Sequence, residues 1–145
     1  MAERRPRLFD VNALVALCLT SHQHHRAAHA YLAGLSAWAT CPLTEATLFR
    51  LLLNPLVTGR PITQADATAS MTGYRTDSRW RFLDDDTTLA SPTVDPRVLA
   101  GHQQVTDLHL VNLAARHDAV LASFDAAILG WLAPTDRRHV ELIPV

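Results

Sequence analysis

Five short apolar runs alternate with segments of helical periodicity along this chain, at residues 7–11, 37–41, 80–83, 119–122 and 140–143. Most of these runs are continuously apolar, which is typical of parallel strands that are buried on both faces. Strands that alternate with helices predict an α/β sandwich, in which helices flank a central, mostly parallel sheet of about five short strands. Because the chain has 145 residues and no internal repeat, we expect residues 1–145 to form a single domain.

The helical segments are bounded by residues that commonly begin helices. Ser21, Thr63 and Thr106 are predicted N-caps, and Pro42 suits the first turn of a helix. Residues 56–61 are predicted to be a loop. The predicted helices cover residues 12–19, 21–34, 42–54, 63–76, 106–117 and 126–132, with a short helical segment at 97–101.

The composition excludes several kinds of protein. The formal net charge is −1, so no overall basic field attracts nucleic acid, and any contact with a polyanion must be local. All 13 basic residues are arginine, and the absence of lysine argues against a P-loop or a receiver-type phosphotransfer site. Cys18 and Cys41 match no zinc spacing. No stretch resembles a signal peptide or a membrane span, so we expect a cytoplasmic protein without membrane contact.

Two aspartates each follow directly on an apolar run and precede a helix. Asp10 ends the first run, and Asp125 follows Ser123 after the fourth. An ionised carboxylate at the edge of a core is costly unless it is paired, hydrogen-bonded or bound to a metal. A helix N-cap is the structural alternative at both positions.

Two more acids begin the apolar stripes of predicted helices. Glu45 and Asp107 each stand at the first position of an i, i+3, i+4, i+7 pattern, and an acid seldom faces a core without a partner. A simpler explanation is that each acid stabilises the positive end of its helix. The two stripes are Glu45, Leu48, Phe49 and Leu52, and Asp107, Leu110, Val111 and Ala114.

These four acids are predicted to meet beyond the carboxyl ends of the strands, where ligands bind in such sheets. Two carboxylates about 4 Å apart repel by about 4 kcal/mol at an effective dielectric constant of 20, so a cluster of four requires a cation. Oxygen ligands favour Mg²⁺ or Mn²⁺. Such ions support hydrolysis of phosphodiester bonds.

Four motifs occur in an order that resembles PIN-domain ribonucleases, and among them the VapC-type toxins of bacterial toxin–antitoxin pairs. They are Leu8-Phe9-Asp10-Val11-Asn12, Thr44-Glu45 with Arg50, Thr106-Asp107-Leu108-His109-Leu110, and Ser123-Phe124-Asp125. The resemblance implies a Mg²⁺- or Mn²⁺-dependent endoribonuclease whose acidic quartet is Asp10, Glu45, Asp107 and Asp125. It implies that Asn12 and Ser123 support the site, and Arg50 is a candidate contact to RNA. It also implies a homodimer that is held inactive by a small antitoxin protein.

Two other functions stay open. A PIN-like module could hold RNA or a protein without cutting, although the intact quartet argues against this. A phosphotransfer or hydrolase domain on a similar sheet lacks the expected lysine and nucleophile motifs. The cluster of His22, His24, His25 and His29 is interpreted as a solvated helix face. The run Asp84-Asp85-Asp86 is interpreted as a solvated turn.

Overall fold

Five parallel strands form one sheet in the order β3-β2-β1-β4-β5 in the computed structural model, which describes residues 5–145. Residues 1–4 of the predicted domain lie outside the described part. The central strand β1 pairs with β2 through Leu8 and Ala39, and with β4 through Leu8 and Leu121. The strands are β1 Arg7–Phe9, β2 Trp38–Thr40, β3 Trp80–Phe82, β4 Val120–Ser123 and β5 Val140–Leu142. The predicted α/β sandwich is confirmed, and every strand pair in the sheet is parallel.

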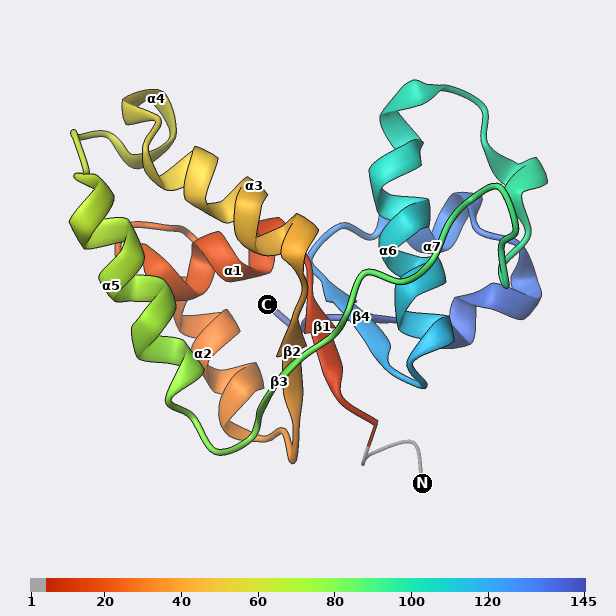
Figure 1. Cartoon of the computed structure of the whole chain (residues 1–145), viewed down its shortest axis with the longest axis horizontal. Coiled ribbons are helices and arrows are strands. Elements are labelled where there is room, and N and C mark those ends of the chain that lie inside the picture. Colours follow the sequence, from red (N-terminus) through yellow and green to blue (C-terminus); the bar gives the residue numbers. More distant parts are fainter. Residues whose placement is uncertain (1–4) are drawn as a thin grey trace.

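Helices cover both faces of this sheet, with α1 to α5 on one side and α6 and α7 on the other (Figure 1). The α-helices are α1 Val11–Cys18, α2 His25–Ala33, α3 Pro42–Leu52, α4 Pro55–Thr58, α5 Gln64–Arg75, α6 Val105–Arg116 and α7 Ala127–Trp131. The short 3₁₀ helices are η2 Pro96–Val98, η3 His102–Gln104 and η4 Pro134–His139.

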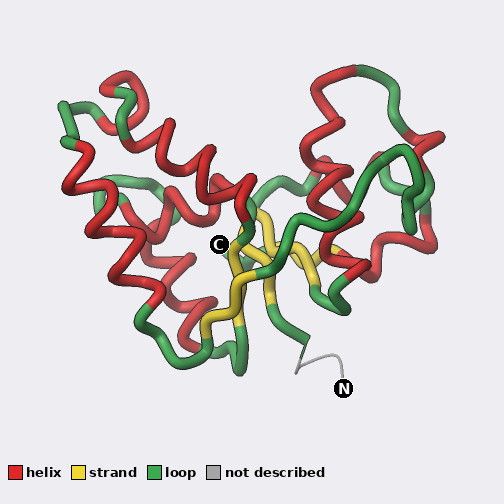
Figure 2. The backbone as a smooth tube through the Cα atoms, in the orientation of Figure 1, coloured by secondary structure: helices red, strands yellow, loops and turns green. Residues whose placement is uncertain are grey.

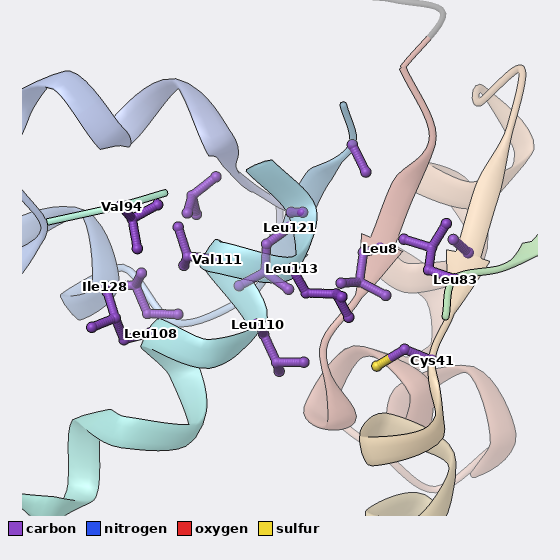
Figure 3. Packing of buried hydrophobic residues seen from close by; sticks show 14 of the residues in the cluster. Leu8, Cys41, Leu83, Val94, Leu108, Leu110, Val111, Leu113, Leu121 and Ile128 are labelled. Carbon is purple, nitrogen blue, oxygen red and sulfur yellow. The ribbon is translucent and has the colours of Figure 1, made fainter. Parts of the chain in front are cut away.

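Successive residues of the central strands point into two separate apolar cores. Leu8 packs into the core under α6, whereas the adjacent Phe9 packs into the core under α1. Both side chains are fully buried, which explains why these strands are apolar without alternation. Figure 3 shows the first core, where Leu113 of α6 lies against Leu8 of β1 and Leu108 of α6 lies beside Ile128 of α7.

Three local predictions fail for identifiable reasons. The second helix begins at His25 rather than after Ser21, because His22 and His25 first form tight turns on Leu19 and His22. Thr106 does not cap α6, which begins one residue earlier and continues directly from η3. The predicted loop at 56–61 contains part of α4, because the Asn54 side chain accepts a hydrogen bond from the amide of residue 56 and caps this turn.

A long irregular segment, residues 83–95, connects β3 to the opposite half of the molecule (Figure 2). We call it the strap, because it runs beside α6 and is bound to it by side chains. The Oδ1 atom of Asn112 accepts hydrogen bonds from the amides of Thr93 and Val94 at 2.8 and 3.4 Å. The strap is therefore attached to α6 by hydrogen bonds. Across residues 5–145, no helix has the length and apolar character that crossing a membrane requires.

Candidate active site

A pocket lies where the carboxyl ends of β1 and β4 meet the first turns of α3 and α6. Parallel strands all end at the same edge of the sheet, and the helices that follow them begin there. Ten residues line the pocket: Asp10, Val11, Asn12, Leu43, Thr44, Thr47, Thr106, Asp107, Leu110 and Asp125. Three of the four predicted acids therefore share one pocket.

Asp10 is the most deeply buried of these acids, with 6% of its surface exposed. Its Oδ1 atom accepts a hydrogen bond from the Ala13 amide at 2.9 Å, so Asp10 is the N-cap of α1. The hydroxyl of Ser123 also donates to its carboxylate. Burial nevertheless raises the pKa of Asp10 to about 6, and the charges of Asp107 and Asp125 add to this rise. The structural and functional interpretations of Asp10 are thus compatible, because one oxygen caps the helix while the carboxylate also lines the pocket.

Asp107 and Asp125 line the same pocket but come from two different segments, the helix α6 and the loop after β4. Asp107 lies half-buried in the first turn of α6, where burial raises its pKa and the nearby charge of Asp125 raises it further. Asp125 is exposed, and its Oδ1 accepts a hydrogen bond from the Ala127 amide at 2.9 Å. The amide of Asp125 donates to Oγ of the buried Ser123 at 3.0 Å. Ser123 therefore connects the loop of Asp125 with the carboxylate of Asp10.

Glu45 is not among the residues that line this pocket. Its carboxylate accepts hydrogen bonds from the hydroxyls of Thr40, at 2.7 Å, and Tyr74, at 3.2 Å. The Arg75 side chain lies 3.8 Å from the same oxygen. The structure therefore brings together Asp10, Asp107 and Asp125, and places the Glu45 carboxylate on the other side of the first turn of α3.

The pocket has the donor chemistry of a site for a hard divalent cation. Its possible ligands are carboxylate, amide and hydroxyl oxygens, which Mg²⁺ and Mn²⁺ prefer, and its described lining contains no arginine. Within residues 5–145, no three His, Cys, Asp or Glu side chains are close enough, as they stand, to hold a metal ion. The pocket therefore suits such an ion in its ligand atoms and its negative charge, but its carboxylates are too far apart to bind one ion together without moving.

Comparison with known proteins identifies the family. Residues 7–129 match the PIN domain. The chain belongs to the PIN-domain family. It is 39% identical to the Mycobacterium tuberculosis protein named Ribonuclease VapC38 over 140 residues, which are 95% of this chain and 98% of that protein. It is 38% identical over 124 residues to Ribonuclease VapC39 of the same species, covering 83% of this chain and 89% of the relative. A third relative from that species, Ribonuclease VapC29, is 36% identical over 122 residues, with 83% and 86% covered.

The other predicted site residues of this PIN domain lie in different positions. Asn12 is exposed and lines the pocket, so this residue borders the space that a ligand would occupy. Arg50 is exposed on α3 and does not line the pocket. Thr44 and Thr47 are lining residues that the sequence interpretation missed, and their spacing of three residues on a helix was the available signal. Their hydroxyls donate to the backbone oxygens of Cys41 and Leu43 respectively.

The histidine cluster of the PIN domain is bound to the end of α1. His25 Nδ1 lies 2.7 Å from the carbonyl oxygen of Ala16, and His29 Nε2 lies 2.9 Å from that of Leu17. The interpretation as a solvated face agrees with the exposure of His29 but misses these hydrogen bonds. They satisfy carbonyl groups that a helix C-terminus leaves without partners.

Proposed function

We propose that this PIN domain is a metal-dependent endoribonuclease that hydrolyses RNA phosphodiester bonds. The observation that carries the proposal is the convergence of Asp10, Asp107 and Asp125 on one pocket at the carboxyl edge of a parallel sheet. The relatives named ribonucleases support it, because they match most of this chain. Mg²⁺ or Mn²⁺ is the proposed cofactor, held by these three carboxylates.

A divalent ion in this pocket would supply charge compensation at the phosphate and activation of water. The protein's own contribution is to hold and orient the carboxylates. Asp10 is fixed by the Ala13 amide and the Ser123 hydroxyl, so it needs little reorganisation on binding a ligand. Asn12 lies at the pocket surface, where its amide can donate a hydrogen bond to a phosphate oxygen. Arg50, exposed on α3, is a proposed contact to the RNA backbone outside the pocket.

Glu45 is proposed to support the site from outside the pocket. Thr40 and Tyr74 bind its carboxylate, and Glu45 directly follows Thr44, which lines the pocket. The bond from Thr40 holds the first turn of α3 to β2, and the bond from Tyr74 holds it to α5. In this proposal Glu45 contributes to the acidic quartet by positioning α3, while the other three acids are the ligands.

The biological role proposed is that of the toxin in a toxin–antitoxin pair. The relatives share the name VapC, and the motif order described above resembles the toxins of that type. We propose a small antitoxin protein as the partner, a homodimer as the assembled state, and cellular RNA in the cytoplasm as the substrate.

RNA cleavage by matched variants tests the enzymatic proposal. The parent protein is expected to cut structured RNA with Mg²⁺ or Mn²⁺ and to lose this activity in EDTA. Asp10→Asn and Asp107→Asn should each abolish cleavage, whereas Asp66→Asn should not. Asp66 is a suitable control because it is an exposed acid in the first turn of another helix, α5. Cleavage by both pocket variants at the parent rate would contradict the proposal.

A binding module that holds RNA without cutting is the second candidate. The observation that favours it is that the carboxylates do not form a closed ligand set as they stand. Calorimetric titration with Mn²⁺ separates the two functions. Metal binding that disappears in Asp107→Asn supports the nuclease, and RNA binding without any metal binding supports the module.

A further inference from the structure

Arg75, at the end of α5, and two aromatic rings of the edge strand β3 form a cluster. Figure 1 shows β3 following α5 in the chain at this side of the sheet. The Arg75 guanidinium lies 4.4 Å from the ring centroid of Trp80 and 5.2 Å from that of Phe82. Trp80 and Phe82 point to the same side of the strand because they are two residues apart, and their ring centroids are 6.1 Å apart. We call these three residues the stacking cluster.

The stacking cluster remains accessible to solvent. Phe82 is 40% exposed, and the Arg75 side chain is 42% exposed. An exposed aromatic ring on an edge strand is usually a liability, because edge strands can pair with other chains. Binding of a flat ligand by the ring and the guanidinium plane would explain why this aromatic ring is exposed.

The stacking cluster is connected to Glu45, in the first turn of α3, through hydrogen bonds. The indole Nε1 of Trp80 donates to Oγ1 of Thr40 at 3.0 Å, and the same hydroxyl donates to Glu45 at 2.7 Å. The residue before Glu45, Thr44, lines the pocket. The cluster and the pocket therefore lie on opposite sides of the first turn of α3.

The stacking cluster and the pocket also both lie towards the carboxyl ends of the strands. Thr40 and Phe82 are paired in register at the carboxyl ends of β2 and β3, and Asp10 directly follows β1. Neighbouring strands are about 4.8 Å apart, so β3 lies about 10 Å from β1. A phosphate in the pocket and a base on β3 can therefore belong to the same nucleotide or to neighbouring nucleotides of one RNA strand.

We propose that Arg75, Trp80 and Phe82 form a stacking subsite for an unpaired nucleobase of the RNA whose phosphate lies in the acidic pocket. This inference rests on the proposed ribonuclease function. Aromatic rings and arginine planes bind the π-face of any base, and such stacking requires a base that is not paired in a duplex. The subsite therefore selects single-stranded RNA next to the cleavage point. It does not read the base sequence by hydrogen bonds.

Two substitutions in the cluster and one on the same strand test this subsite. Phe82→Leu keeps an apolar side chain but loses the ring, and Arg75→Gln loses the guanidinium. Arg81→Gln is the matched control, because Arg81 is exposed on β3 and its NH1 atom donates to backbone oxygens of Ser78 and Trp80. Thermal melting of each variant establishes that it is folded.

The measurements are KM and kcat for a short single-stranded RNA with Mn²⁺, and the Kd for the same RNA in EDTA by fluorescence anisotropy. Stacking of one base is worth about 1–3 kcal/mol, so Phe82→Leu is expected to raise KM and Kd about tenfold with little change in kcat. Arg81→Gln should leave both constants near the parent values. RNAs with a single abasic position should show the same loss with the parent protein, at one position only.

The outcomes distinguish this inference from the function on which it rests. If the parent cuts RNA and Phe82→Leu has the parent KM and Kd, the stacking subsite is wrong while the ribonuclease stands. If the parent neither binds nor cuts RNA, the ribonuclease proposal fails and the subsite fails with it. A uniform loss at every abasic position would also contradict a defined subsite.

Discussion

The Nε2 atom of His109 lies 2.8 Å from Oδ1 of Asp85, and this contact fastens the strap to α6. His109 is two residues from Asp107, so the bond lies one half-turn from an acid of the pocket. A second histidine on the same helix, His117, binds the strap through the backbone oxygen of Asp84 and through Oδ1 of Asp86. The acidic run is therefore solvated, as predicted, but it also anchors the strap. The sequence pattern did not predict this second role, because the histidines that bind the acidic run lie more than 20 residues away.

The bond between His109 and Asp85 is expected to stabilise the fold by about 1 kcal/mol, because both side chains are partly shielded from water. His109→Gln, Asp85→Asn and the double variant form a thermodynamic cycle that isolates this contribution. Urea denaturation provides the free energy of unfolding of each protein. Additive effects of the two single substitutions would show that the contact contributes nothing.

Asn112 should be more important for stability than either partner of that bond. It is 1% exposed, and its Oδ1 accepts from two backbone amides of the strap. Asn112→Ala leaves those amides without their partner and is expected to cost about 2–3 kcal/mol. Gln104→Ala is the control, because Gln104 Oε1 makes a similar bond to an exposed amide, that of Ala100. Its expected cost is below about 0.5 kcal/mol, and equal losses in both variants would contradict the assigned role of the strap.

The raised pKa of Asp10 predicts how stability depends on pH. Well below pH 3.8, the ordinary pKa of this group, its carboxyl is protonated in both the folded and unfolded states. As the pH rises towards 6, the unfolded chain ionises first, so this group lowers the free energy of unfolding by about 3 kcal/mol in total. Asp10→Asn keeps an oxygen for the Ala13 amide and removes the charge. In EDTA the variant should therefore become more stable than the parent as the pH rises from 4 to 7.

The difference in the free energy of unfolding between the two proteins is the quantity to measure, because the contributions of groups far from Asp10 are the same in both and cancel. A difference that stays constant from pH 4 to pH 8 would show that burial does not raise the pKa of Asp10. Saturating Mn²⁺ should raise the melting temperature of the parent more at pH 8 than at pH 5, because protons and the cation compete for the same carboxylate. Asp10→Asn should show no such dependence.

Because Glu45 lies outside the pocket, its substitution is expected to reduce activity more than metal binding. Glu45→Gln retains oxygen and amide groups near Thr40 and Tyr74 but loses the charge, so cleavage should slow while Mn²⁺ affinity stays within about threefold of the parent. Tyr74→Phe removes one hydrogen bond to this carboxylate and should cost about 1 kcal/mol of stability. Loss of Mn²⁺ binding in Glu45→Gln, comparable to that in Asp107→Asn, would instead make Glu45 a direct ligand.

The strands and the placement of three acids could be predicted because both depend on short-range patterns. An apolar run such as Leu8-Phe9 followed by Asp10 determines a buried strand and the first residue beyond it. Parallel pairing then brings Asp125 to the same edge as Asp10. The direction of the Glu45 side chain depends on Tyr74, a partner 29 residues away that the periodicity of α3 does not reveal. The anchoring of Asp85 was not predicted for the same reason, because it depends on the distant His109. The predicted cap at Ser21 failed for a local reason, because tight turns at His22 and His25 precede the helix.

The order of the strands has a consequence for when the pocket can exist during protein synthesis. β1 is translated early, yet one of its two neighbours is β4, which begins more than 100 residues later. Asp107 and Asp125 also belong to the last third of the chain. A partly translated chain can therefore form the helices around α1 without assembling the acidic pocket. The proposed nuclease activity therefore cannot arise before translation has passed Asp125.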